Sequence, residues 1–98
     1  MRIITERKLR EFWQKHKPAE SSLREWVRVV RNADWNDFTD VRQTFNHADI
    51  YKRCVIFDVG GNKYRIITMI EYQKHLVFIR FCLTHAEYDE QKWQLDCQ

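Results

Sequence analysis

The sequence predicts an α+β domain in which helices come first and a small, mainly antiparallel sheet follows. Apolar residues recur at helical spacing in the first part of the chain, and the second part carries three runs rich in Val, Ile, Phe and Tyr. A chain of 98 residues with 44% hydrophobic composition is long enough for one core but too short for two. We therefore expect residues 1–98 to form a single domain.

The first part of the chain predicts a helical hairpin. Residues 2–5, "RIIT", favour a short strand, after which Thr5 is a candidate helix cap. Two sets of residues then follow at i, i+3, i+4, i+7, namely Leu9, Phe12, Trp13 and His16, and Leu23, Trp26, Val27 and Val30. The first helix should end near Pro18, and either Pro18 or the pattern Ser22-x-x-Glu25 could start the second.

The rest of the chain predicts a short helix and a sheet. "NADWNDFTDVRQTF" supplies turn residues and then a helix over residues 37–45. Three strand-like runs follow, "CVIFDV", "KYRIITMI" and "HLVFIRFCL", joined by "GGN" and "EYQK". Gly60 and Gly61 suit a tight hairpin that needs positive φ, so an antiparallel meander is the simplest result. The GGN amides could also bind phosphate, but no nucleotide-binding glycine motif surrounds them.

Cysteine and histidine spacing predicts no metal site. Cys54, Cys82 and Cys97 form no C-x-x-C pair, and two of them lie in apolar runs, so we expect buried thiols without disulfides. The histidines have no i, i+4 partner, and no cofactor is expected. The sequence has no run of 18 apolar residues and no signal-peptide pattern, which predicts a cytoplasmic protein without membrane contact.

Charge is unevenly distributed along the chain. The net charge of +3 is small, but residues 50–85 hold six basic and two acidic groups, and residues 86–98 hold one basic and four acidic groups. A basic segment with aromatic residues is compatible with nucleic-acid binding, although scattered surface charge is the commoner explanation. Trp13 and Trp26 could stack on bases, but their place on apolar helical stripes favours core packing.

Two arginines interrupt apolar strands and require partners. Arg65 breaks "YRIITMI" and Arg80 breaks "FIRFC", and a buried guanidinium is rarely left unpaired. One interpretation is a pair of structural ion pairs, for example to Asp58 or Glu71. The other places both arginines on one concave sheet face, where they hold phosphate through bidentate hydrogen bonds.

A histidine and a tyrosine follow the last strand in "CLTHAEYDE". His85 and Tyr88, together with the arginines, are sufficient to cleave RNA without a metal. A base takes the 2′-OH proton, an acid protonates the leaving 5′-oxygen, and cations stabilise the charge on the phosphate oxygens. His85 suits proton transfer near neutral pH. A solvated surface histidine at the end of a strand is the structural alternative.

Two paired motifs extend this interpretation. "FDVGGNKYRI" followed by "FIRFCLTHAEYDE" resembles the HigB family of toxin–antitoxin toxins, which have a RelE-like fold, and the likeness covers nearly the whole chain. The resemblance implies a ribosome-dependent mRNA endoribonuclease, or mRNA interferase, that stops translation. It also implies a HigA-type antitoxin with a helix-turn-helix domain. The antitoxin would neutralise the toxin and make the contact with operator DNA.

The resemblance also implies roles for individual residues. Arg65 and Arg80 correspond to phosphate-stabilising arginines, and His85 and Tyr88 to acid, base or orienting groups, with Asp89 as an orienting neighbour. Four further residues are expected to contact messenger or ribosomal RNA: Lys52, Arg53, Asn62 and Lys63. Two alternatives remain open at this point. The protein could bind RNA without cutting it, or it could be a ribonuclease that acts without the ribosome.

Overall fold

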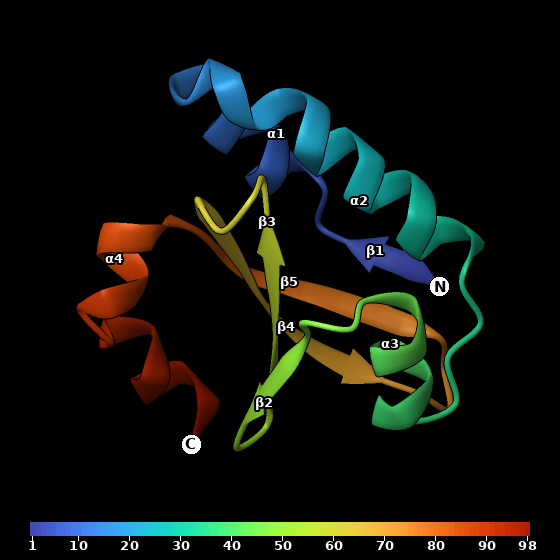
Figure 1. The fold of residues 1–98 in the computed structure, drawn as a ribbon. Helices are drawn as coiled ribbons and strands as arrows, with labels where there is room; N and C mark the ends of the chain where they lie inside the picture. Colours follow the sequence, from blue (N-terminus) through green and yellow to red (C-terminus); the bar gives the residue numbers. More distant parts are fainter.

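The computed structural model describes residues 1–98 and shows one five-stranded sheet with elements packed on both faces (Figure 1). The elements in chain order are β1 Arg2–Ile4, α1 Arg7–Lys15, η1 Lys17–Ala19, α2 Glu20–Asn32, α3 Phe38–Thr44, β2 Asp49–Tyr51, β3 Cys54–Val59, β4 Tyr64–Glu71, β5 Leu76–Thr84, α4 His85–Asp89 and η2 Lys92–Cys97. The α+β class predicted from the sequence is confirmed. No helix is both long and apolar enough to cross a membrane.

The sheet contains the predicted meander and one short strand at each edge. The strand order is β1-β5-β4-β3-β2, with β3, β4 and β5 antiparallel to their neighbours in the meander. β2 pairs antiparallel with β3, and β1 pairs parallel with β5. The parallel pairing of β1 brings the start of the chain beside its last strand, so the helical hairpin begins at the edge of the sheet.

The helical hairpin covers one face of the sheet. α1 buries Leu9, Phe12 and Trp13, as its spacing predicts, and Trp26 of α2 is 1% exposed against the ring of Phe57 in β3. Core packing, rather than base stacking, is therefore the role of the two tryptophans in the hairpin. Pro18 lies in the 3-10 turn η1 between the helices, where its missing N–H costs no helical hydrogen bond.

Helix starts differ in part from their predicted caps. Thr5 does not cap α1, whose N-cap position is occupied by Glu6 without a side-chain cap bond. The Glu6 carboxylate instead pairs with Arg31 of α2, an interaction between helices that local sequence cannot reveal. α3 matches its expectation, because the Asp37 side chain accepts a hydrogen bond of 2.9 Å from the amide of Asp40.

The opposite face of the sheet has its own small apolar cluster. Ile56 and Ile67 point to this side, where Trp93 of η2 packs against them. The alternation of side chains along β3 and β4 separates these residues from the main core beneath the helices. The last part of the chain, α4 and η2, therefore covers the face that the helical hairpin leaves free (Figure 1).

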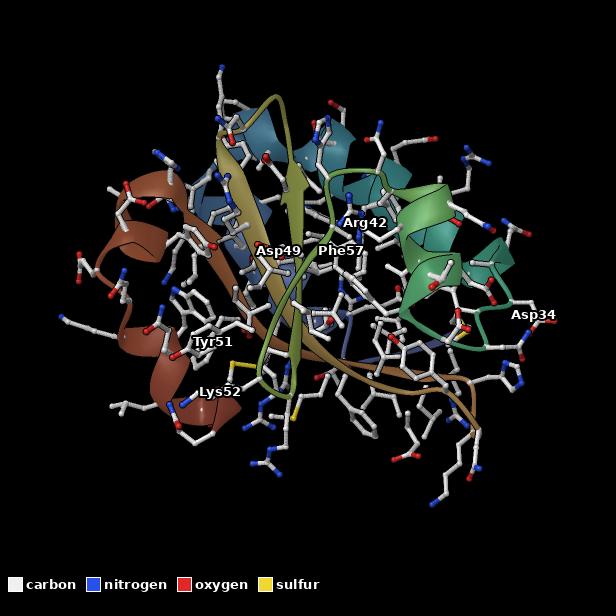
Figure 2. All side chains as sticks on the ribbon, turned by 60° about the horizontal axis from the view of Figure 1, so that its bottom comes forward. Asp34, Arg42, Asp49, Tyr51, Lys52 and Phe57 are labelled. Carbon is white, nitrogen blue, oxygen red and sulfur yellow. A yellow bond between two sulfur atoms is a disulfide. The ribbon has the colours of Figure 1, made fainter.

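The prediction of unpaired cysteines is wrong for two of the three. Cys54 at the start of β3 and Cys97 in η2 form a disulfide across 43 residues of chain, visible as the yellow bond in Figure 2. Spacing could not show this pairing, because it depends on η2 folding back over the sheet. Cys82 is a free thiol, and burial, followed by the charge of Glu87, raises its pKa to about 12.

The disulfide should contribute measurably to stability. Closing a loop of 43 residues lowers the entropy of the unfolded chain by an amount worth about 4 kcal/mol. We expect Cys97→Ala to lower the midpoint of urea unfolding and to abolish its sensitivity to dithiothreitol. Cys82→Ala is the control and should retain that sensitivity. Equal midpoints for the native protein with and without reductant would contradict the pairing.

Candidate active site

Arg65 is the centre of the candidate site, on the sheet face that α4 and η2 cover. The residue is buried, at 8% exposure, and several acceptors hold its side chain. Nη1 donates to Asp58 Oδ1 at 3.1 Å, to the Asn62 carbonyl at 3.1 Å and to the Tyr64 carbonyl at 3.3 Å, and Nη2 donates to Asn62 Oδ1 at 2.7 Å. The ion pair with Asp58, which is one of the two interpretations that the sequence leaves open, is thus present for this arginine.

Strand register explains the contact between Arg65 and Asp58. The two residues are directly opposed in the β3–β4 ladder, where side chains on one face lie within reach of each other. The turn between these strands supplies the other ligand. Gly60, Gly61 and Asn62 all have positive φ, with values of 66°, 62° and 76°, and this tight turn brings the Asn62 side chain back toward Arg65.

"CLTHAEYDE" is the junction between a strand and a helix, and the sequence prediction did not include this helix. β5 ends at Thr84, and α4 begins at His85 with a reciprocal capping box. The Thr84 hydroxyl accepts from the Glu87 amide at 3.2 Å, and the Glu87 carboxylate accepts from the Thr84 amide at 2.9 Å. The pattern Thr-x-x-Glu in the sequence is the signal that could have identified this start.

Helix α4 displays Tyr88 over the buried arginine. The Tyr88 ring lies 4.9 Å from the Arg65 guanidinium carbon on one side and stacks on Trp93 on the other, with 5.0 Å between the ring centroids. The Trp93 indole N–H donates to the Tyr88 carbonyl at 2.9 Å, which fixes this turn of chain. The ring of Tyr88 is therefore clamped between a cation and an aromatic plane.

Burial raises the pKa of the Tyr88 phenol above its ordinary value. The positive charge of Arg65 acts in the opposite direction, while the negative charges of Asp49, Asp89 and Asp58 raise the pKa further. The phenol consequently keeps its proton at neutral pH. It is suited to donate a proton or a hydrogen bond and unsuited to act as a base.

His85 lies at the rim of the site with its imidazole open to solvent. Its backbone amide donates to the Lys63 carbonyl at 2.9 Å, which joins α4 to the β3–β4 turn. The imidazole Nε2 is 3.4 Å from Asp89 Oδ2, and the side chain is 53% exposed. His85 and Asp89 are one helical turn apart, so α4 itself places the carboxylate where it can orient the imidazole.

Of the eight residues that the sequence predicts to be catalytic or to bind RNA, the structure brings five together and leaves three elsewhere. Arg65, His85, Tyr88, Asn62 and Lys63 meet around the β3–β4 turn and α4. The remaining residues are Arg80, Lys52 and Arg53. All three contact η2 or the last residue of the chain.

Arg80 pairs with Asp96, a partner different from the two acids that the sequence suggested. Its Nε lies 2.5 Å from Asp96 Oδ2 in η2. A bulge opposite Ile67 and Thr68 places Arg80 outside the regular β4–β5 pairing. Leu83 is the residue opposite Arg65, so Arg80 lies three residues, or about 10 Å, further along β5. The two arginines share no partner in the structure.

Lys52 and Arg53 form the turn between β2 and β3, at the end of β3 that is remote from Asp58. Lys52 Nζ lies 2.5 Å from Gln98 Oε1, and the Arg53 amide donates to the Cys97 carbonyl at 3.2 Å. Figure 2 shows Lys52 close to the disulfide. Both residues therefore belong to the surface around the end of the chain.

Two residues near the site were missed by the sequence prediction. His47, in the loop before β2, lines an open hollow of about 460 Å³ together with Asp58, Gly61 and Asn62. Asp49, labelled in Figure 2, lies at the start of β2, and its negative charge raises the pKa of Tyr88. Neither could be placed from the sequence, because the edge strand β2 is only three residues long and was not predicted.

Carboxylates outnumber cations immediately around the Tyr88 phenol. Asp49, Asp58 and Asp89 all act on this group, against the single positive charge of Arg65. A phosphate that approached Tyr88 would therefore meet one buried guanidinium inside a ring of acids. Additional positive charge for holding a polyanion would have to come from other parts of the surface.

Comparison with known proteins places the chain in a sequence family. The model of HigB_toxin, described as the RelE-like toxic component of a toxin-antitoxin system, matches residues 19–91, which include the β3–β4 turn and α4. The mRNA interferase HigB of Escherichia coli O6:H1 (strain CFT073) is 29% identical over 93 residues, covering 92% of this chain and 90% of the relative. The mRNA interferase toxin HigB of Escherichia coli K12 is 25% identical over 92 residues, covering 91% and 88%.

The position of Asp49 leads to a test of the site geometry. Asp49→Asn removes a negative charge that disfavours the phenolate, so it should lower the pKa of Tyr88. Phenolate absorbance titrated against pH measures this change, and Tyr88→Phe identifies the contribution of Tyr88. Asp34→Asn is the control, since Asp34 lies away from the site beside His75 (Figure 2). Equal shifts in both aspartate variants would contradict the arrangement.

Proposed function

This chain belongs to the HigB family of RelE-like toxins, and from that premise we propose that it is an endoribonuclease that stops translation by cutting messenger RNA on the ribosome. The observation that carries the proposal is the cluster of Arg65, Tyr88 and His85. These residues come from the two sequence motifs, and both motifs lie within the residues that the family model matches. The 98 residues are proposed to act as one domain.

We assign the steps of cleavage to side chains of this chain. His85 takes the proton from the 2′-OH, which then attacks the adjacent phosphorus and breaks the bond to the 5′-oxygen. Tyr88 gives a proton to that oxygen, since its raised pKa keeps the phenol protonated. Asp89 orients His85 through the contact at 3.4 Å. The products are a 2′,3′-cyclic phosphate and a free 5′-hydroxyl, and no metal ion is required for these transfers.

Arg65 stabilises the negative charge that develops on the phosphate. Its Nη atoms hold Asp58 and Asn62, while its Nε–H makes no hydrogen bond within the protein. This group, aimed by a fixed network, is a preorganised donor of the kind that lowers a reaction barrier. Asn62 and Lys63 border the same turn and would position the RNA strand.

Arg80, Lys52 and Arg53 are proposed to contact RNA away from the bond that is cut. Arg80 lies about 10 Å along β5 from the level of Arg65, so it would hold a neighbouring phosphate of the same strand. Lys52 and Arg53 would meet ribosomal RNA, where cations contribute affinity regardless of sequence. The ribosome confines this activity to the cytoplasm. A helix-turn-helix antitoxin would be the partner that neutralises the toxin and contacts operator DNA.

One observation favours RNA binding without cleavage as a second candidate function. Arg65 is already bonded to an acid and to two carbonyl groups inside the protein, as a purely structural arginine would be. In that case the face around α4 would bind RNA through Lys63 and its neighbours, and His85 would transfer no proton. A histidine substitution separates the two functions, because only proton transfer makes the rate depend strongly on the imidazole.

His85→Asn should lower cleavage by about 10²- to 10⁴-fold while ribosome binding stays nearly unchanged. Primer extension on messages in a translation extract, with and without ribosomes, measures cleavage, and co-sedimentation measures binding. His75→Asn is the matched control, since His75 is an exposed histidine with φ of 56° that asparagine tolerates. Parallel loss of binding and cleavage in His85→Asn would favour the non-catalytic function. Cuts in naked RNA would contradict ribosome dependence.

Arg65 and Arg80 should differ in their kinetic effects. Arg65→Lys removes the Nε–H donor and the guanidinium network that holds it, so the rate at saturating ribosome concentration should fall by about 10²-fold. Arg80→Lys should raise the half-saturating concentration and leave that rate almost unchanged. Single-turnover cleavage over a range of ribosome concentrations measures both quantities. An equal fall in the saturating rate for both variants would instead place Arg80 at the bond that is cut.

A further inference from the structure

An arginine-lined groove runs between α1 and α2 on the outer side of the helical hairpin. It has a volume of about 340 Å³, and its walls include Arg10, Arg24, Arg28 and Arg31, together with Trp13 and Glu6. We call these residues the arginine groove. None of them takes part in the candidate active site, which lies on the other face of the sheet (Figure 1).

The groove presents its cations in a regular row. Arg24, Arg28 and Arg31 are spaced by four and three residues along α2, so they share one face of the helix over about 10 Å. Arg10 approaches from α1 across the groove. The Arg24 guanidinium lies 4.8 Å from the Trp13 ring centroid, which gives the groove a flat aromatic wall beside the charges. Such a row matches about three successive phosphates of one nucleic-acid strand.

Acids pair with three of the four arginines in the groove, but these pairs are exposed. Arg31 pairs with Glu6 across the helices, and Arg24 and Arg28 pair with Glu20 and Glu25 within α2. These arginine side chains are 58% to 65% exposed, so solvent screens their ion pairs and an incoming phosphate can replace the carboxylates. Arg10 takes part in none of the ion pairs.

The helical hairpin and the last part of the chain carry opposite charge balances. Residues 6–32, which contain the helical hairpin, hold eight basic and four acidic groups, a balance of +4. Residues 86–98, which cover the opposite face, have a balance of −3, from one basic and four acidic groups. An anionic polymer is therefore attracted to the hairpin more strongly than to α4 and η2.

We propose that the arginine groove binds the phosphate backbone of a second RNA segment, separate from the strand that is cut. The inference rests on the proposed function only in taking RNA as the target. An acidic protein segment is the competing ligand, but a protein interface needs apolar anchors, and Trp13 and Val27 are the only apolar residues in the groove. Phosphates require only the cations that are present.

The test uses Arg10→Gln/Arg28→Gln, which removes two charges without removing a contact between the helices. Arg24 and Arg31 are kept because they contact Trp13 and Glu6 of α1. Fluorescence anisotropy measures binding to a short labelled RNA duplex over a range of salt concentrations. We expect affinity at low salt to fall by about tenfold or more and the slope of log affinity against log salt to become shallower by about two.

Two further variants make the test specific. Arg7→Gln/Arg42→Gln removes the same charge from exposed positions outside the groove and should leave affinity and slope nearly unchanged. Arg10→Lys/Arg28→Lys retains the charge and should retain the slope. Circular dichroism melting of all variants excludes unfolding as the cause of a loss.

Three results would overturn the proposal. The first is unchanged RNA binding in Arg10→Gln/Arg28→Gln. The second is an equal loss in the Arg7 and Arg42 control, which would indicate diffuse charge. The third is intact RNA binding with lost binding of polyglutamate, which would assign the groove to an acidic protein. Message cleavage by the native protein is measured in parallel, so binding at the groove without cleavage would refute the proposed function and leave this inference standing.

Discussion

The structure around the candidate site depends on the need to neutralise one guanidinium in the middle of a sheet. Arg65 is 8% exposed, and a charge at that depth is stable only when acceptors surround it. Asp58 across the ladder and Asn62 from the glycine turn provide those acceptors, and the Tyr88 ring closes the site above them. The contacts that compensate the buried charge of this arginine also hold its side chain in one position, where it can bind a phosphate.

The end of the chain couples this site to the rest of the protein. Trp93 stacks on Tyr88 and belongs to the small apolar cluster on this face, and the Cys54–Cys97 disulfide ties η2 to the start of β3. Arg80 and Asp96 add an ion pair between β5 and the same segment. Tyr88 thus keeps its place over Arg65 through contacts made well beyond α4, so substitutions in η2 can change the site without touching it.

Local sequence patterns predicted the parts of the fold that depend on local physics. Both helices of the hairpin, α3 and the three long strands follow from periodicity and turn chemistry. The motifs after Gly60 and Thr84 contain Arg65, His85 and Tyr88, which meet in the candidate site. The disulfide and the Arg80–Asp96 pair depend on where η2 packs against the sheet. The position of Asp49 near Tyr88 depends on where β2 joins the edge of the sheet. That packing is tertiary, and neither spacing nor propensity along the chain determines it.

In the mechanism that we propose, the 2′-hydroxyl of the message is the nucleophile, and His85, Tyr88 and Arg65 provide its chemistry. The most direct measurement uses a translated message with a single 2′-deoxynucleotide placed immediately 5′ of a mapped cut. We expect this substitution to abolish the cut at that position while ribosomes still stall with bound toxin. Cleavage that continues at the same phosphate would show that water attacks instead, and it would contradict the proposed mechanism.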